Sequence, residues 1–348
     1  MGASHQPGNV RLAAAAIAAV AALACLGGSI FAAEPGGRAE WEKNYHRPAE
    51  IPFPKDNPYS DAKVKLGKVL FFDPILSGSS VRSCATCHNP GLSWGDGRAR
   101  AMGEGQKPLP IRSPTLLNVA WTPKLGWDGH FRSLEAVAMG PITGATNMNL
   151  PESEMIARLT AIPGYVDAFH AAFGKGPITG KKVELALATF ERMIVSGEAP
   201  FDHWLAGDEK ALSDAAKRGF DLFNGKANCA ACHSGWAFTD ASFHDIGTAT
   251  GDDIGRGKLF PTSVKLKHAF KTPTLRDVAR RGPYMHDGSV ASLEAVIDLY
   301  NRGGIDRPSR SEEIRPLNLS KEEKADLIAF LHALNGPAEP YPMPVLPR

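Results

Sequence analysis

Two short stretches, SCATCHNPG at residues 83–91 and NCAACHSGW at residues 228–236, constrain this chain more than any other feature. They hold four of its five cysteines in two Cys-x-x-Cys-His motifs, Cys84, Cys87 and His88 in the first and Cys229, Cys232 and His233 in the second. In such a motif both thiols bond a porphyrin and the histidine ligates its iron. Two copies therefore predict two covalently bound c-type haems.

Two alternatives exist for each motif, a thioredoxin-like redox pair and half of a zinc site. A thioredoxin motif needs no histidine directly after its second cysteine and lies between a strand and a helix. A zinc site would have to join motifs that are 145 residues apart. Both features favour haem attachment.

The first part of the chain is typical of a secretory leader. Residues 12–33 form an uncharged apolar run behind Arg11 and end in small residues, so we expect a signal peptide over residues 1–33. The run is also long enough for an uncleaved membrane anchor, the only membrane contact expected, and Cys25 within it leaves a lipoprotein open. Each alternative places the body in the periplasm, where haem is attached to such motifs.

The overall charge indicates no particular partner. The formal net charge is +2, and removing residues 1–33 takes away Arg11 and no acidic residue, which leaves +1. Four ionised haem propionates would bring the total to about −3. Such a small charge gives no reason to expect nucleic acid binding.

The sequence contains an internal repeat. Residues 113–137 align without a gap at an offset of 159 to residues 272–296, and 12 of the 25 positions are identical. Each copy follows one haem motif. Helical periodicity behind Ser213, and a capping box of Ser320 and Glu323 before another helical pattern, agree with an all-α fold. The chain is therefore predicted to be all-α, with two tandem cytochrome c-like domains that each hold one haem.

We expect the division between the domains near residue 205, after a helix over residues 184–197 that closes the first unit. Residues 34–205 would form the N-terminal domain with the reactive haem. Residues 206–348 would form the C-terminal domain with the electron-transfer haem.

The second axial position of each iron decides its chemistry, because a second protein ligand makes an electron carrier and an open position admits a small substrate. The candidates in the second unit are Met285, His286 and Tyr300. The repeat offset maps these onto Gly126, Trp127 and Pro141, none of which ligates iron. A closed electron-relay haem at His233 and a reactive haem at His88 are therefore predicted. Trp127 itself is either a packed aromatic or an electron carrier between the haems.

Longer segments carry a specific resemblance, among them LGKVLFFDPILSGSSVRSCATCHNP, WDGHFRSLEAVAMGPI and FKTPTLRDVARRGPYMHDGS. Through them the chain resembles the bacterial dihaem cytochrome c peroxidase family, which includes the enzyme that matures methylamine dehydrogenase by oxidising its tryptophans. The resemblance implies a C-terminal haem that receives electrons from a small cytochrome or copper protein, and an N-terminal haem that meets hydrogen peroxide. Trp127 matches the inter-haem tryptophan of the family. Tyr300 matches the second axial ligand of the C-terminal haem, with Met285 as the alternative.

The chain departs from the family beside the reactive haem. The distal glutamate matches Asn147, a distal glutamine matches Val137, and Glu104 has the spacing of a removable distal histidine. A peroxidatic site needs a group that moves a proton between the peroxide oxygens. Asn147 can donate a hydrogen bond but cannot take up and return a proton. Glu104 could, if its loop reaches the pocket; otherwise it is a solvated carboxylate.

Calcium between the domains is typical of the family, through a side-chain amide that here matches Arg112. A cation at that position would repel Ca²⁺, so the metal is doubtful here.

Three functions are consistent with these features. The first is a periplasmic peroxidase that reduces hydrogen peroxide to water with electrons from a small redox protein. The second directs oxidising equivalents outward to an aromatic or protein substrate. The third is a dihaem electron-transfer protein without enzymatic activity. Assembly as a homodimer stays open.

Overall fold

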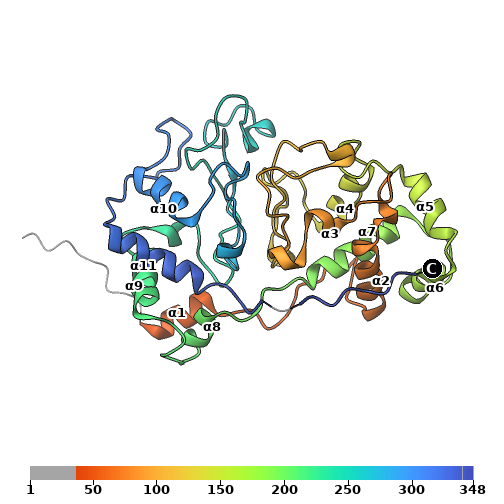
Figure 1. Ribbon diagram of the computed structural model, residues 1–348, viewed down its shortest axis with the longest axis horizontal. Coiled ribbons are helices and arrows are strands. Elements are labelled where there is room, and N and C mark those ends of the chain that lie inside the picture. The colour runs from red at the N-terminus through yellow and green to blue at the C-terminus, as the bar shows by residue number, and fades with distance from the viewer. Residues whose placement is uncertain (1–36, 339, 348) are drawn as a thin grey trace, which may run out of the picture. The chain divides into compact units, whose positions relative to one another are not determined.

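The computed structural model describes residues 37–338 and 340–347 (Figure 1). The predicted signal peptide lies outside the described residues. The described chain is mostly helical, and its one two-stranded sheet pairs β1 (Phe243–His244) antiparallel with β2 (Phe270–Lys271). Among these residues no helix has the length and apolar character needed to cross a membrane. The predicted all-α class is thus confirmed, with this small sheet as an addition.

The helices fall into two groups by the core to which they contribute. The first group is α2 (Asp61–Phe72), α3 (Cys84–Cys87), α4 (Leu134–Thr143), α5 (Glu152–Thr160), α6 (Pro163–Phe173) and α7 (Gly180–Arg192). The second is α1 (Arg38–Tyr45), α8 (Pro200–Leu205), α9 (Asp214–Asn224), α10 (Leu293–Arg302) and α11 (Lys321–His332). Short 3-10 turns are η1 (Pro74–Leu76), η2 (Pro90–Leu92), η3 (Glu104–Gln106), η4 (Val119–Trp121), η5 (Cys229–Ala231), η6 (Arg256–Lys258) and η7 (Val278–Arg280).

The predicted helix starts are confirmed. Ser213 caps α9 by accepting a hydrogen bond from the Ala216 backbone N–H, and Ser320 and Glu323 form the capping box of α11. The helix expected over residues 184–197 is α7, which begins earlier and ends at Arg192.

Each unit is built on the crossing of two helices at a glycine. Gly67 of α2 lies against the Ala186 carbonyl of α7, and Gly219 of α9 lies against the Asp326 carbonyl of α11. A Cβ at either glycine would collide with that backbone, so only glycine lets these helices approach so closely. Figure 1 shows α9 beside α11 in one unit and α2 beside α7 in the other. The two units therefore share this helix pair in addition to the repeated stretch, which lies outside these four helices.

The repeated stretch has the same backbone in both copies. Gly126 and its counterpart Met285 both have positive φ, 80° and 71°. At the end of the stretch, Ser133 caps α4 and Ser292 caps α10 in the same way. A methionine rarely adopts this left-handed conformation, so the second copy has kept a glycine-type turn after losing the glycine.

The two larger hydrophobic cores of the described residues are not separated by a single division of the chain. Tyr45 of α1 and Phe201 of α8 pack in the core of the second unit. Near the other end of the chain, Tyr341 stacks on Phe72 of the first unit with ring centroids 5.7 Å apart. The division expected near residue 205 stays a prediction. Segments on each side of that position pack in the core of the other unit.

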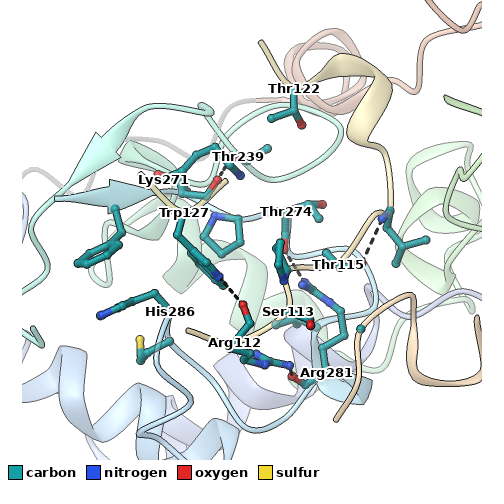
Figure 2. Close-up of a pocket in the computed structure, with 18 of the residues that line it drawn as sticks. Arg112, Ser113, Thr115, Thr122, Trp127, Thr239, Lys271, Thr274, Arg281 and His286 are labelled. Atoms are coloured by element: carbon teal, nitrogen blue, oxygen red, sulfur yellow. Dashed lines mark hydrogen bonds between the residues drawn. The ribbon is translucent and has the colours of Figure 1, made fainter. Parts of the chain in front are cut away.

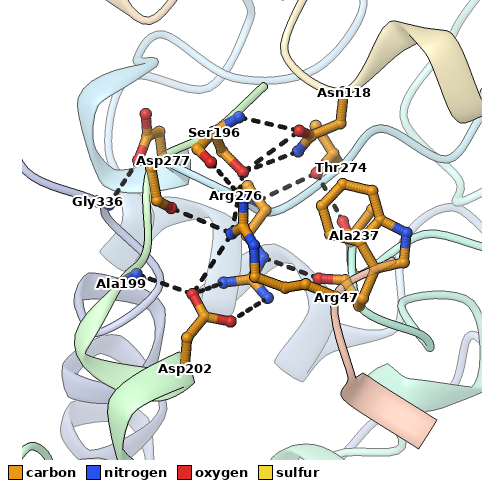
Figure 3. A network of polar contacts seen from close by, with 12 residues as sticks. Arg47, Asn118, Ser196, Ala199, Asp202, Ala237, Thr274, Arg276, Asp277 and Gly336 are labelled. Carbon is orange, nitrogen blue, oxygen red and sulfur yellow. Dashed lines mark hydrogen bonds and ion pairs between the residues drawn. The ribbon is translucent and has the colours of Figure 1, made fainter. Parts of the chain in front are cut away.

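A buried polar network holds the linker between α7 and α8 against the repeated loops (Figure 3). Arg276, which is 0% exposed, donates to both carboxylate oxygens of Asp202 at 2.6 and 2.8 Å. The Asn118 side-chain oxygen accepts from the Ser196 backbone N–H at 3.0 Å. Its counterpart Asp277 accepts from the backbone N–H of Gly336 at 2.8 Å. Both repeats thus use the same contact to fix the chain that follows α7 or α11.

Candidate active site

The first Cys-x-x-Cys-His motif is held by a short capped helix. Cys84 and Cys87 are the first and last residues of α3, which Ser83 and Thr86 close with a capping box. His88 follows at once, with its Nδ1 3.3 Å from the Trp94 carbonyl oxygen. Because a carbonyl only accepts, Nδ1 carries the proton and Nε2 keeps a free lone pair. Burial lowers the pKa of His88, which favours this neutral form.

The second motif reaches the same arrangement on a 3-10 turn. Cys229 begins η5, Cys232 follows the turn, and the His233 Nδ1 lies 2.9 Å from the Phe238 carbonyl oxygen. Burial lowers the pKa of His233 to about 4. Both histidines are therefore oriented and neutral, as an iron ligand must be.

A cavity of about 790 Å³ connects the two motifs. All four cysteines are free thiols, and they line this cavity together with both histidines. Most of the other lining side chains are apolar, such as Leu116, Leu187, Ile297 and Leu327. Four free thiols, two oriented imidazoles and an apolar enclosure fit two covalently attached haems.

Met285, His286 and Tyr300, the candidates for the second iron ligand of the second haem, differ in whether their side chains are free to bind iron. Tyr300 and Met285 both line the cavity. Burial raises the pKa of the Tyr300 phenol, with Cys229 and Cys232 near enough to add to this. His286 is engaged elsewhere, because its Nε2 lies 2.6 Å from the Asp253 carboxylate and its ring stacks on Phe270.

The corresponding positions of the first unit, Gly126, Trp127 and Pro141, also line the cavity. None of the three offers a side chain that binds iron. The asymmetry between the two units that the repeat predicts is thus present in the geometry of the lining.

Trp127 lies where the two repeats meet. The Trp127 carbonyl accepts from the Lys271 backbone N–H at 2.8 Å, and the His286 carbonyl accepts from the Arg112 backbone N–H at 2.9 Å. These are the same contact made twice, because the repeat offset pairs Trp127 with His286 and Arg112 with Lys271. The Trp127 indole N–H donates to the Arg112 carbonyl at 2.9 Å (Figure 2), and the ring is only 9% exposed.

Asn147 and Glu104 lie in neighbouring segments, but only Asn147 lines the cavity. Asn147 lines the cavity, as does Val137, whereas Glu104 is not among the lining residues. The two segments are joined by the Glu104 backbone N–H, which donates to the Thr146 carbonyl at 3.1 Å. One buried carboxylate oxygen of Glu104, Oε2, has no hydrogen-bond partner. The loop of Glu104 therefore reaches the wall of the first pocket, one residue from Asn147.

The residues at this position do not fit the calcium that is typical of the family. Arg112 is buried where the family has an amide, and its guanidinium donates to the Arg281 carbonyl beside a second buried guanidinium, that of Arg281 (Figure 2). Calcium requires a shell of oxygen ligands, and two adjacent cations oppose it.

Three cavity residues were missed by sequence reasoning, Glu191, Lys271 and Arg281. Glu191 lines the first pocket, and burial raises its pKa to about 8. The repeat offset could have drawn attention to Lys271, because it pairs that residue with Arg112 and both are basic. No comparable signal marks Glu191 or Arg281, whose burial depends on the tertiary fold.

An all-α tandem repeat with a Cys-x-x-Cys-His pocket in each half defines a dihaem c-type cytochrome. Comparison with known proteins makes this more specific. The model of the di-haem cytochrome c peroxidase family matches residues 61–210, and that of cytochrome c matches residues 216–335. This chain belongs to the di-haem cytochrome c peroxidase family, is a haem-dependent oxidoreductase and carries two covalent c-type haems.

The relatives include two kinds of enzyme. The methylamine utilization protein MauG of Methylorubrum extorquens is 54% identical over 89% of this chain and 88% of its own length. The cytochrome-c peroxidase IdrP1 of Denitromonas iodatirespirans is 38% identical over 82% of this chain and 84% of its own length. Among solved structures, a MauG-like protein associated with microbial copper homeostasis superposes with a TM-score of 0.78 at 32% identity, covering 84% of this chain and 95% of that one.

Proposed function

We propose that this chain is a periplasmic enzyme that uses hydrogen peroxide to oxidise an external aromatic or protein substrate. In the balanced reaction, peroxide takes up two electrons and two protons and gives two molecules of water, while the substrate loses two electrons and two protons. The observation that carries the proposal is that Tyr300 and its repeat counterpart Pro141 both line the cavity, so that only the second pocket has at this position a side chain able to bind iron. The 54% identity to a MauG protein supports it.

The open pocket provides the place for peroxide. Cys84, Cys87 and His88 would hold a haem here, which would supply redox-active iron, and the matched Pro141 offers that iron no ligand. Asn147 lines this pocket and can orient peroxide by donating a hydrogen bond from its side-chain amide. Glu104, whose backbone contacts the residue before Asn147, could accept and return a proton if its carboxyl turned toward the cavity.

Trp127 is proposed to pass electrons between the two halves. It is buried at the seam, contacts the backbone of the second unit through Lys271, and lies 6.4 Å from the ring of His286. Its indole is oriented by the Arg112 carbonyl. A fixed aromatic ring at this point shortens the path between the pockets, whichever direction the electrons travel.

A second candidate is reduction of peroxide with electrons from a small cytochrome or copper protein. The 38% identity to a cytochrome-c peroxidase supports this alternative. The peroxide step would be the same in both cases, and only the source of the electrons would differ.

The test is to mix purified dihaem protein with hydrogen peroxide and then offer two separate electron sources. One is N-acetyl-tryptophan amide, analysed for oxidised products by mass spectrometry. The other is a reduced small c-type cytochrome, followed by its visible absorption. Oxidised tryptophan supports the proposal, and oxidation of the cytochrome alone supports the second candidate. If peroxide is consumed no faster than by free haem, both are wrong.

A further inference from the structure

Three basic side chains line the cavity where the two repeats meet: Arg112, Lys271 and Arg281. In the view of Figure 2, Arg112 and Arg281 lie near each other and Lys271 lies beyond Trp127. Arg112 and Arg281 are each only 8% exposed, and Lys271 is partly buried. No ion pair joins any of the three to a carboxylate within residues 37–338 and 340–347. The described part of the protein therefore encloses three positive charges that form no ion pair with a carboxylate.

The hydrogen bonding of the two guanidinium groups is also incomplete. Arg112 donates to the Arg281 carbonyl, and Arg281 donates to the Thr274 carbonyl. The Nε of each arginine is buried and has no partner. Buried donors in folded proteins are nearly always satisfied, so two orphaned Nε atoms in one cluster indicate acceptors that the polypeptide does not supply.

The acidic groups that act on these cations also make other contacts. Asp96 accepts from the Arg98 backbone N–H at 3.1 Å, and Asp277 accepts from the Gly336 backbone N–H at 2.8 Å. Asp240 lies 2.8 Å from Nε2 of His244. Burial and the neighbouring Arg112 lower the pKa of Arg281 to about 10. Burial and Arg281 lower the pKa of Lys271 to about 8. Uncompensated buried cations are strongly destabilising, and an added anion relieves the cost.

We propose that Arg112, Lys271 and Arg281 bind the propionate carboxylates of the haems at the seam, and that they replace the calcium ion expected from the family resemblance. Haem propionates are the anions that the cofactors necessarily bring into this cavity. A guanidinium offers a carboxylate two parallel N–H donors, which satisfies the orphaned Nε atoms and the excess charge together. This inference rests on the two haems and is independent of the substrate proposed above.

The parent dihaem protein gives the first arm of the test. It should contain substoichiometric calcium after purification, and its visible spectrum and unfolding temperature should not respond to EGTA or to added Ca²⁺. Stoichiometric calcium whose removal changes the spectrum would overturn the proposal. This arm needs no variant and does not depend on peroxide activity.

The second arm measures reduction potentials in the variant Arg112→Gln. Losing a cation beside a propionate favours the ferric state, so at least one haem potential should fall. A tenfold shift of the ferric–ferrous equilibrium corresponds to about 59 mV for one electron. Arg112→Lys should retain most of the parent potential, and Arg132→Gln, the same charge change at an exposed position, should have no effect. Unchanged potentials in Arg112→Gln would contradict the proposal.

A third variant tests the replacement directly. Arg112→Asn removes the cation and restores an amide of the type that the family uses, so its spectrum or unfolding temperature should become sensitive to Ca²⁺. If Arg112→Asn fails to fold with haem, the reduction potentials of Arg281→Gln are measured instead. A propionate site shared by the two arginines predicts that a haem potential falls in this variant too. A potential that stays at the parent value in that variant would refute the shared site.

Discussion

The two repeats have one backbone and two different sets of cavity side chains. Trp127, Gly126 and Pro141 of the first copy stand where the second has His286, Met285 and Tyr300. The turns, the helix caps and the reciprocal hydrogen bonds at the seam are nevertheless the same. A duplicated haem scaffold can therefore be specialised by changing a few cavity-lining positions, while its backbone stays the same.

The comparison extends to the second helix of each crossing pair. The matching contacts of Gly67 with Ala186 and of Gly219 with Asp326 align α7 with α11, and this alignment pairs Glu191 with Leu331. Both residues line the cavity. The first pocket therefore contains an ionisable group at a position where the second is purely apolar.

The largest effect is expected from removing one proximal histidine at a time. His88→Gly should abolish the reaction with peroxide and leave the low-spin spectrum of the second haem, because His233 still holds that iron. His233→Gly should leave peroxide access to the first pocket and disrupt the low-spin signal instead. Rapid-mixing absorption spectroscopy of both variants checks this. Similar behaviour of the two would mean that the pockets are not specialised.

The next effect concerns the proton-transfer group that the first pocket lacks at position 147. If Asn147 only orients peroxide, Asn147→Glu should accelerate the first peroxide step, by about 10²- to 10⁴-fold for a well-placed acid/base group. If Glu104 already performs this role, Glu104→Gln should slow the step by a similar factor and Asn147→Glu should change little. Stopped-flow rates with peroxide distinguish these outcomes. If neither variant changes the rate, neither residue belongs to the proposed site.

A smaller effect tests which residue closes the second pocket. Tyr300→Phe should alter the low-spin spectrum and raise the potential of that haem, because a phenolate is an anionic donor that favours ferric iron. Met285→Leu should have only a slight effect. Spectroelectrochemical titration of the two variants gives the answer, and the opposite pattern would reassign the ligand to Met285.

Much of this architecture could be predicted from local sequence, and the reason is physical. The haem motifs and the caps at Ser213 and Ser320 depend on neighbouring residues, so short patterns report them. The 12 identities of the repeat were sufficient to identify the tandem units. They also identified Trp127 and His286 as equivalent positions of the two repeats. That the two rings lie 6.4 Å apart was not part of that prediction.

The remaining features depend on contacts between distant segments. The last helix of the first unit ends at Arg192, before the predicted residue 197, because the chain turns there and the Ile194 carbonyl accepts from the Asn118 backbone N–H at 2.9 Å. Periodicity within the helix cannot report that partner. In the same way, the cluster of Arg112, Lys271 and Arg281 exists only because the two repeats meet, and its charges look like ordinary surface residues in the sequence.

The smallest expected effect comes from the difference between Glu191 and Leu331. Arg192 is committed to Glu135 by two hydrogen bonds of 2.7 and 3.1 Å. Burial outweighs the opposing effect of Arg192 and raises the Glu191 pKa to about 8. An unfolded glutamate titrates near a pKa of about 4.3, so the folded protein binds more protons than the unfolded chain between these two values. The free energy of unfolding should therefore fall as pH rises through this range.

Glu191→Leu, which copies the second pocket, and the isosteric Glu191→Gln should remove this contribution. Relative to the parent, both variants should gain stability steadily from about pH 4.3 to about pH 8, because only the parent must take up a proton on folding in this range or bury a charged carboxylate above it. Urea unfolding of the dihaem proteins, followed by circular dichroism, measures the difference. Glu198→Gln, at an exposed position shortly after α7, should follow the parent across this range. If the curves of the Glu191 variants and the parent run parallel, Glu191 is ionised in the folded protein, and the first pocket has no neutral acid to set it apart from the second.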